Sequence, residues 1–206
     1  MPRPKSLTHE RIAAAALAVI DRAGLDTLSM RTVAQELGIG TMSLYRYVED
    51  REQLEQLVVD LVLNDLDPAR PDGSWTERVI VLAERVRDAV GAHPAVVPLF
   101  LSHRHRNRHV MAWGEAVLGT LTEAGFADRR RVVAFRTLIS YLVGAFSAEQ
   151  LGPLSGPGTI VLAELPPTPF PLLAETARTA REIPAAEEFR GGLAILLAGL
   201  AATNPP

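Results

Sequence analysis

The sequence of 206 residues contains no cysteine. This absence excludes disulfides, a thiolate nucleophile and a zinc site built on cysteine. Long hydrophobic runs are also missing, because apolar stretches such as 192–202 fall well short of the ~20 residues that span a bilayer. The basic segment 1–6 leads into an amphipathic stretch, so we identify no signal peptide. We therefore expect a cytoplasmic protein without a membrane partner.

The sequence also lacks the motifs of common catalytic sites. It has no glycine-rich phosphate loop, no G-x-S-x-G or H-E-x-x-H motif and no convincing pair of carboxylates. We therefore expect neither an enzyme nor a bound cofactor. The net charge of −3 does not by itself indicate nucleic-acid binding. Residues 1–48 carry six arginines or lysines against four acidic residues, which is a weak positive footprint.

Apolar residues recur at three- and four-residue spacings along most of the chain, and no alternating pattern of useful length predicts a strand. In the first third, turn signals separate short helices. Thr8 and Ser29 are placed to cap the first two helices, and Gly24 and Gly38 are placed to end them. A third short helix is expected over 41–48, and a fourth follows directly.

The segment 67–74 has two prolines and a glycine and is typical of a linker. We place a domain boundary there, which gives a helix-turn-helix domain with its connecting helix over 1–66 and a larger helical domain over 67–206. The stretch 152–171 holds six prolines and is predicted to be a loop, with at most a short extended piece over 158–162. The further helical pieces are expected over 75–92, 96–101, 108–124, 128–150, 174–182 and 186–202.

The most informative segment is 29–47 (SMRTVAQELGIGTMSLYRY), which predicts a helix, a tight turn and a second short helix. Ala34 is small enough for the two helices to cross closely, Gly38 suits the turn, and Ile39 and Leu44 would anchor inward. Hydroxyl groups can bond phosphates, arginine can fork onto guanine and methyl-bearing side chains can touch thymine, so the outward face suits a major groove. That outward face comprises Thr41, Met42, Ser43, Tyr45, Arg46 and Tyr47.

Residues 8–63 resemble the DNA-binding domain of the TetR family. The resemblance lies in an opening helix that ends in Ala-Gly, a polar-M-R-x-V-A-x-E-L-G helix, a T-x-x-L-Y-x-Y helix and a following D-R-x-x-L helix. Gly40 stands where the family often has a polar residue, and Val48 where phenylalanine is more usual. The DNA contacts that the resemblance implies are Ser29, Arg31, Thr41, Met42, Ser43, Tyr45, Arg46, Tyr47 and Arg51.

Each of these residues also has a purely structural interpretation. Tyr45 and Tyr47 could be half-buried core aromatics, and Ser29 could act as a helix cap alone. Arg31 and Arg51 could be solvated surface residues. The spacing of all these residues together favours the helix-turn-helix.

Reading a palindromic operator requires two recognition helices about 34–36 Å apart, so DNA binding predicts a homodimer. By resemblance, the regions 136–146 and 189–200 would form a four-helix bundle between subunits, since their small residues permit close approach. The alternative is that they form the core of one subunit. The predicted interface comprises Gly144, Phe146, Phe189, Leu193, Leu196 and Leu197.

The second domain also supplies candidates for a ligand pocket. They are mostly apolar, which indicates a hydrophobic or aromatic small molecule, although any single residue of this kind is more often plain core. His105 and His109 lie four residues apart, as metal ligands on a helix can, but no nearby carboxylate completes a site. For them we expect a solvated basic segment and no metal, with an anion contact as the alternative. The pocket candidates are Val86, Leu99, Phe100, Met111, Trp113, Leu121, Phe135, Leu138 and Tyr141.

Together these features predict an all-α protein with an N-terminal three-helix helix-turn-helix domain and a larger helical domain for ligand binding and dimerisation. The resemblance implies a TetR-type transcriptional regulator that represses from a palindromic DNA operator. A small-molecule effector would release it by shifting the population to a geometry that no longer fits the grooves. One alternative is a small-molecule-binding helical protein without operator binding. Another is an all-helical enzyme, which would need an acid–base constellation that the sequence does not show.

Overall fold

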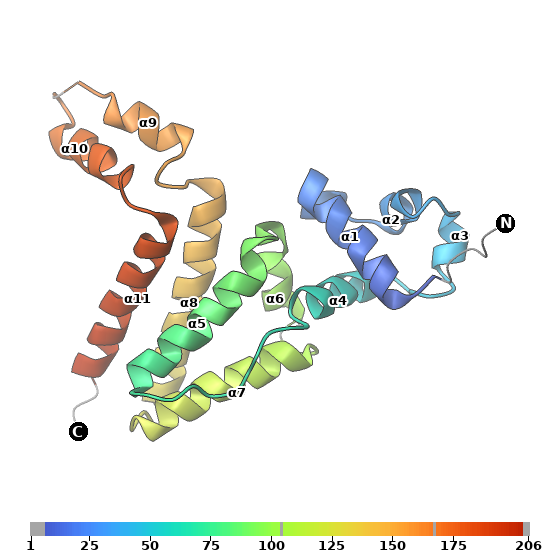
Figure 1. The fold of residues 1–206 in the computed structure, drawn as a ribbon, viewed down its shortest axis with the longest axis horizontal. Helices are drawn as coiled ribbons and strands as arrows, with labels where there is room; N and C mark the ends of the chain where they lie inside the picture. Colours follow the sequence, from blue (N-terminus) through green and yellow to red (C-terminus); the bar gives the residue numbers. More distant parts are fainter. Residues whose placement is uncertain (1–6, 104, 167, 204–206) are drawn as a thin grey trace. The chain divides into compact units, whose positions relative to one another are not determined.

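The computed structural model describes residues 7–103, 105–166 and 168–203. The basic segment 1–6 and Pro167 of the predicted loop lie outside the described residues. Within the described ranges the chain is helical and contains no strand, which confirms the predicted all-α fold class (Figure 1).

The chain forms two compact units that are not contiguous in sequence. Two helices, α5 (Trp75–Gly91) and α7 (Arg108–Glu123), each contribute residues to both units. A cut between the units therefore does not follow any single linker. The units consist of Met1–Ala69 with Glu84–Ala116, here called unit 1, and of Arg70–Ala83 with Val117–Pro206, here called unit 2.

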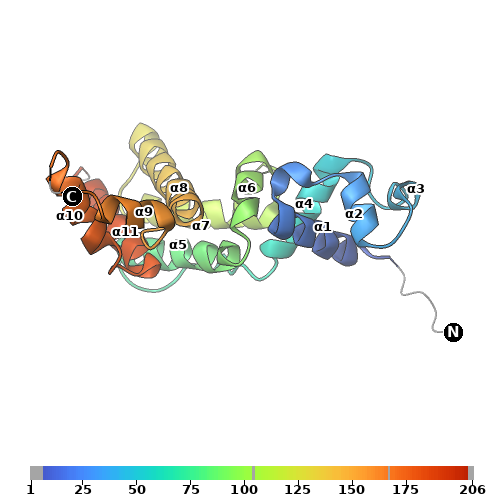
Figure 2. The ribbon, with the colours of Figure 1, turned by 90° about the horizontal axis from the view of Figure 1, so that it is seen from above.

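Unit 1 contains the helices of the predicted DNA-binding motif (Figures 1 and 2). The first helix packs against α4 and α2, and α6 packs against α4. Ile12, Ala16 and Ile20 are fully buried on one face of α1, as the three- and four-residue spacing predicts. The elements wholly within unit 1 are α1 (His9–Ala23), η1 (Leu25–Thr27), α2 (Met30–Glu36), α3 (Thr41–Leu44), α4 (Arg51–Val62), η2 (Pro94–Val96) and α6 (Val97–His103).

The predicted caps of the first two helices are confirmed. The Thr8 hydroxyl accepts a hydrogen bond from a backbone amide in the first turn of α1, at 3.3 Å. The Ser29 hydroxyl accepts from the amide of Thr32 at 3.1 Å, and the Thr32 hydroxyl accepts from the amide of Ser29 at 2.9 Å. Gly24 ends α1 with a φ of +86°, which favours glycine. These local signals fix where the two helices begin and the first one ends.

The third helix is shorter than predicted. The expected range was 41–48, but α3 ends at Leu44 and the chain continues as a tight turn. The amides of Tyr47 and Val48 both donate to the carbonyl of Leu44, so the last turn tightens. Val48 is 1% exposed, because the chain turns inward there to bury it. The turn keeps the side chains that follow α3 close to it.

Unit 2 is built around two long helices, α8 (Asp128–Leu151) and α11 (Ala185–Ala202), which lie side by side. The stacked rings of Phe146 and Phe189, 6.0 Å apart, join them. A shorter pair, α9 (Pro157–Ala163) and α10 (Pro171–Ala180), packs together in the same unit. Helical pairing therefore forms the core of unit 2 (Figure 1).

The prediction of a loop over 152–171 is wrong in its middle, where α9 forms. The expected extended piece at 158–162 is part of this helix. Pro157 occupies the first turn, where its missing amide hydrogen costs no helical bond. The other prolines fall before or after α9, so none interrupts it. The loop was predicted from the number of prolines, whereas the positions of the prolines are what allow α9 to form.

By length and composition, α8 could cross a membrane, and it is the one such helix in the part of the chain that the structure describes. Only 22% of its most apolar window is buried. Core helices of soluble proteins pass the same test, and Leu138, Leu142 and Phe146 of α8 are buried within unit 2. The apolar character of α8 is therefore accounted for in part by packing.

Candidate nucleic-acid interface

The turn between α2 and α3 determines where the candidate DNA-contacting helix lies. Gly38 has a φ of +67°, which side chains rarely adopt. The amide of Ile39 then donates to the carbonyl of Ala34 at 3.0 Å and closes the turn. Ala34 and Leu44 are 1% and 0% exposed, so each helix of the motif has an inward anchor. The sequence motif thus folds into the predicted helix-turn-helix.

The outward face of α3 and its following turn is exposed in the structure. Met42 is 78% exposed, Tyr45 48% and Tyr47 41%. Ser43 and Arg46 are also exposed, while Thr41 is half-buried. These exposures argue against the interpretation of the two tyrosines as core aromatics. The structure brings all six predicted side chains of this segment to one short stretch of surface around the buried Leu44.

Three further candidates lie on neighbouring helices. Arg31 is exposed in the first turn of α2, and Arg51 is exposed at the first position of α4. Ser29 is half-buried, and its hydroxyl is engaged in the capping box described above. The cap is therefore observed for Ser29, and a phosphate contact would have to come in addition to it.

One contact at this surface has no signal in the sequence. Nε2 of His9, in the first turn of α1, donates to the backbone carbonyl of Tyr47 at 3.0 Å. This bond joins the start of α1 to the turn after α3, across 38 residues of sequence. No spacing rule connects positions so far apart, so the sequence could not predict it.

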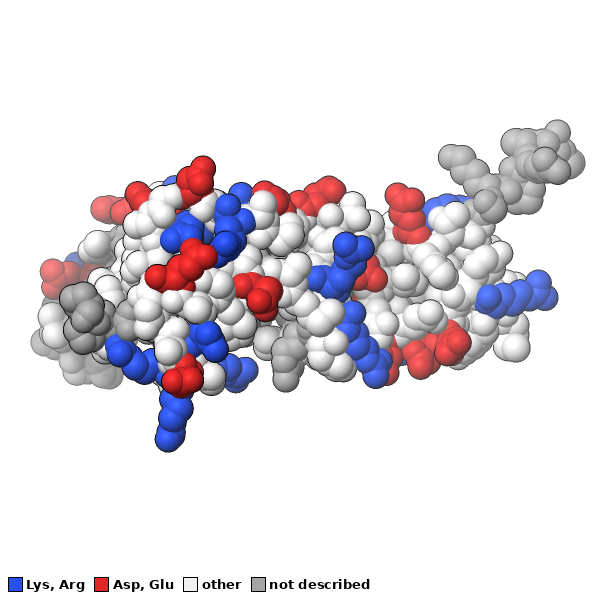
Figure 3. Space-filling model, turned by 90° about the horizontal axis from the view of Figure 1, so that it is seen from below, with Lys and Arg blue, Asp and Glu red and all other residues white. Residues whose placement is uncertain are grey.

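The charges around this surface are mixed. On the face drawn in Figure 3, arginines alternate with acidic residues. Arg22 pairs with Glu36 at 2.6 Å, and hydrogen bonding to this guanidinium lowers the pKa of the Glu36 carboxyl below its ordinary value. No broad positive field marks this face, so positioned single contacts matter more than net charge.

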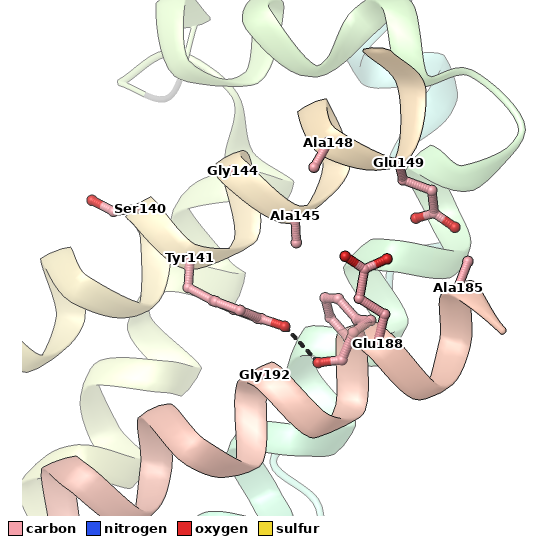
Figure 4. Close-up of a pocket in the computed structure, with 10 residues that line it drawn as sticks. Ser140, Tyr141, Gly144, Ala145, Ala148, Glu149, Ala185, Glu188 and Gly192 are labelled. Carbon is pink, nitrogen blue, oxygen red and sulfur yellow. Dashed lines mark hydrogen bonds between the residues drawn. The ribbon is translucent and has the colours of Figure 1, made fainter. Parts of the chain in front are cut away.

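A cavity of about 360 Å³ lies between α8 and α11 within unit 2 (Figure 4). The Tyr141 side chain extends across this cavity, and its hydroxyl donates to the carbonyl of Phe189 at 2.6 Å. The carboxylates of Glu149 and Glu188 lie at one end, and small residues, including Gly144 and Ala148, form its α8 wall (Figure 4).

The predicted pocket residues are spread over both units. Leu99, Trp113, Leu121 and Leu138 are buried, and Met111 is 49% exposed. The rest are half-buried, and Tyr141 is the one candidate that lines the cavity between α8 and α11. Those in unit 1 are Val86, Leu99, Phe100, Met111 and Trp113, and those in unit 2 are Leu121, Phe135, Leu138 and Tyr141.

The predicted dimer residues fall into two groups. Most of them are buried within unit 2, where they hold α8 and α11 together. Gly144 is exposed and Leu196 half-buried, so these two remain accessible. Ile195 of α11, 77% exposed, was not among the predictions. The buried members are Phe146, Phe189, Leu193 and Leu197.

Two family models match the chain. Residues 12–56 match the model described as "Bacterial regulatory proteins, tetR family". Residues 67–204 match the model described as "Tetracyclin repressor-like, C-terminal domain". The two matches leave out only the segment 57–66 and the chain ends.

Among curated relatives, the chain is similar to the HTH-type transcriptional repressor DrrR1 of Streptomyces coeruleorubidus, at 36% identity over 146 residues. That alignment covers 70% of this chain but 54% of the relative, so the chain spans about half the length of that protein. Among solved structures, apo ActR from Streptomyces coelicolor shares 31% identity, with 95% of both chains covered and a TM-score of 0.75. ActR in complex with actinorhodin shares 30% identity, with 97% and 98% covered and a TM-score of 0.75.

Proposed function

Since the chain belongs to the TetR family of transcriptional regulators, we propose that it represses transcription by binding a palindromic operator as a homodimer. A small molecule releases it from the DNA. The observation that carries this proposal is the exposed face of α3 and the turn after it, where Met42, Tyr45 and Tyr47 surround the buried Leu44. A cluster of exposed apolar and aromatic side chains marks a surface that binds a partner.

The proposed contacts divide by chemistry. Arg46 forks onto a base edge, Met42 meets a thymine methyl group, and the hydroxyls of Tyr45 and Tyr47 bond phosphates. Arg51, at the start of α4, binds a phosphate of the DNA backbone through its positive charge. The remaining proposed contacts are Ser29, Arg31, Thr41 and Ser43, which position the domain on the duplex.

Dimerisation follows from the operator's symmetry. We propose that α8 and α11 supply the interface, with the exposed Gly144 and the half-buried Leu196 in direct contact. The buried Phe146, Phe189 and their neighbours hold the two helices in place behind that surface. In this assignment residues 1–66 bind DNA, and residues 67–206 bind the ligand and the second subunit.

The effector is proposed to be apolar or aromatic, because the candidate pocket residues are mostly apolar. The structural relative ActR was crystallised with actinorhodin, which supports a small-molecule effector without naming one for this chain. A DNA-bound regulator of this kind acts in the cytoplasm, without a membrane partner.

The test is selection of bound duplexes from a random DNA pool at low salt. Wild-type protein is expected to enrich one palindrome, while an Arg46→Ala/Tyr47→Ala variant enriches none. Arg181→Ala, which removes an exposed arginine of unit 2, is the matched control and is expected to behave like wild type. Affinity should fall steeply with added salt. No enrichment by the wild type would contradict operator binding and favour a small-molecule-binding protein without that function.

A further inference from the structure

A buried histidine lies where α6 meets α4. His103 ends α6 and is 2% exposed. Its Nε2 donates to Oε2 of Glu55, on α4, at 2.9 Å. Its Nδ1 is also buried and has no hydrogen-bond partner among the described residues. A buried imidazole with one unpaired nitrogen is destabilising by itself. The bond to Glu55 is the interaction that offsets this cost.

The carboxylate of Glu55 is shared between two donors. Its other oxygen, Oε1, accepts from Nε of Arg51 at 2.8 Å. The Glu55 side chain is only 16% exposed, so water competes little for either oxygen. His103 and Arg51 therefore hold the carboxylate from two sides, and each limits its rotation.

Arg51 is the far end of this chain of contacts. A terminal nitrogen of its guanidinium donates to the carbonyl of Leu25 at 3.4 Å, and the side chain remains 48% exposed. The bond to Glu55 uses Nε, which leaves further N–H groups at the exposed end of the side chain. A guanidinium held in this way is oriented before it meets an anion, so less rotamer freedom is lost on binding.

We propose that His103 is a positioning residue for DNA binding, which acts through Glu55 to orient the guanidinium of Arg51 toward a backbone phosphate. This inference rests on the proposed function, because Arg51 must contact DNA. Without His103, the Glu55 carboxylate either rotates and frees Arg51, or turns both oxygens onto the guanidinium and occupies N–H groups that a phosphate needs. Both outcomes weaken operator binding.

The segment that follows His103 has contacts of its own with α4. Nδ2 of Asn107 donates to Oδ1 of Asp60 on α4 at 2.6 Å, and Asn107 is 5% exposed. Arg106 also pairs with Glu52 of α4. The segment after α6 is thus held on α4 by two contacts that do not involve His103.

The experiment is a double-mutant cycle on the operator selected with the wild type. His103→Gln is expected to weaken binding about fivefold when Arg51 is present, which is the effect of one typical hydrogen bond. In the Arg51→Ala background the same change is expected to have almost no effect. A residue that only stabilises the fold would weaken binding equally in both backgrounds.

His93→Gln is the matched control. His93 also lies in unit 1 and bonds a carboxylate, Oδ2 of Asp21, at 2.8 Å, but no proposed DNA contact shares that carboxylate. It should leave operator affinity unchanged. If His103→Gln does not fold, Glu55→Asp replaces it in the cycle, because it keeps the charge while shortening the side chain, and the same dependence on Arg51 is expected.

Equal losses in both backgrounds, or no loss in either, would overturn the inference. An Arg51→Ala variant that binds as tightly as wild type would overturn it as well. In all these cases the wild type still binds its operator, so the proposed function stands. Failure of the wild type to select any operator is the separate result that would defeat the proposed function itself.

Discussion

Helices α3 and α11 use their large apolar side chains in opposite ways. In and just after α3, one leucine is buried, and Met42, Tyr45 and Tyr47 are left exposed. In α11, Phe189, Leu193 and Leu197 are at most 3% exposed. Side chains on α3 are thus free to meet a partner, while those of α11 mostly hold unit 2 together. Function should therefore be separable from stability at α3 and inseparable from it at the buried positions of α11.

Truncation of a buried aromatic gives the largest contrast between these helices. Phe189→Ala removes the ring that stacks on Phe146 and is expected to destabilise the protein by about 3–5 kcal/mol. Met42→Ala should change stability by no more than about 0.5 kcal/mol while weakening operator binding. Urea unfolding at one protein concentration measures the stability of both variants, and operator titration measures the binding of Met42→Ala. A loss below about 1 kcal/mol for Phe189→Ala would break the comparison.

Two adjacent glycines of α11 give a more specific test of packing, with smaller expected changes in stability. A Cβ added at Gly192 would lie 2.5 Å from the Tyr141 hydroxyl oxygen, whereas one at Gly191 would meet nothing within 4 Å. Gly192→Ala is therefore expected to cost about 1–3 kcal/mol, because the Tyr141 ring would have to move and give up the hydrogen bond of its hydroxyl to the Phe189 carbonyl. Gly191→Ala should gain about 0.5–1 kcal/mol, because alanine favours a helix. Thermal unfolding of the two variants checks the signs, and two shifts of the same sign would refute the role of Gly192.

The cap of α2 tests whether stability and DNA contact separate at one residue. Ser29→Ala is expected to cost about 1 kcal/mol, because the amide of Thr32 loses its acceptor. Ser29→Asp keeps the cap, so its stability should match wild type, but its charge would repel a phosphate. Calorimetry and operator titration on both variants give the answer. If Ser29→Asp binds DNA as well as wild type, Ser29 acts as a cap alone.

The smallest effect concerns surface ion pairs, which should behave alike in the two units. Hydrogen bonds from Arg78, and then from Arg70, lower the pKa of the Glu123 carboxyl in unit 2 below its ordinary value of 4.5. The pKa of Glu123 is lower in the folded state than in the unfolded state. The ionised carboxylate therefore stabilises the protein above the unfolded-state pKa, and this stabilisation is lost as pH falls through the folded-state pKa.

Thermal midpoints of wild type and Glu123→Gln between pH about 3 and 6 measure this dependence. The difference between them should shrink toward the acid end. Glu36→Gln in unit 1 is the counterpart, since Arg22 lowers the pKa of that carboxyl in the same way. A difference that grows on acidification would contradict the assignment for either pair.

Local chemistry explains which features the sequence could predict. The caps at Thr8 and Ser29, the turn at Gly38 and the inward Leu44 depend on residues within a few positions, and all were predicted. The end of α3 was misplaced because burial of Val48 decides it, and burial depends on the rest of the core.

Contacts between distant segments could not be predicted in the same way. Nothing near His103 in the sequence identifies Glu55 as its partner, and the approach of Tyr141 to Gly192 joins helices far apart along the chain. The pocket and interface candidates were chosen by apolar character, which does not distinguish a wall from a core. Their assignment therefore needs the packing of unit 2 as well as its composition.

The division of α5 and α7 between the units bears on how such regulators can be recombined. A chimera joined at the 67–74 linker would carry the DNA-binding helices but exchange α6. The face of α4 that α6 covers would then meet a foreign helix, and Glu55 would lose its histidine. Grafting this operator specificity onto another sensor should thus succeed more often when residues 84–116 travel with the first 69, even though that requires three crossovers instead of one.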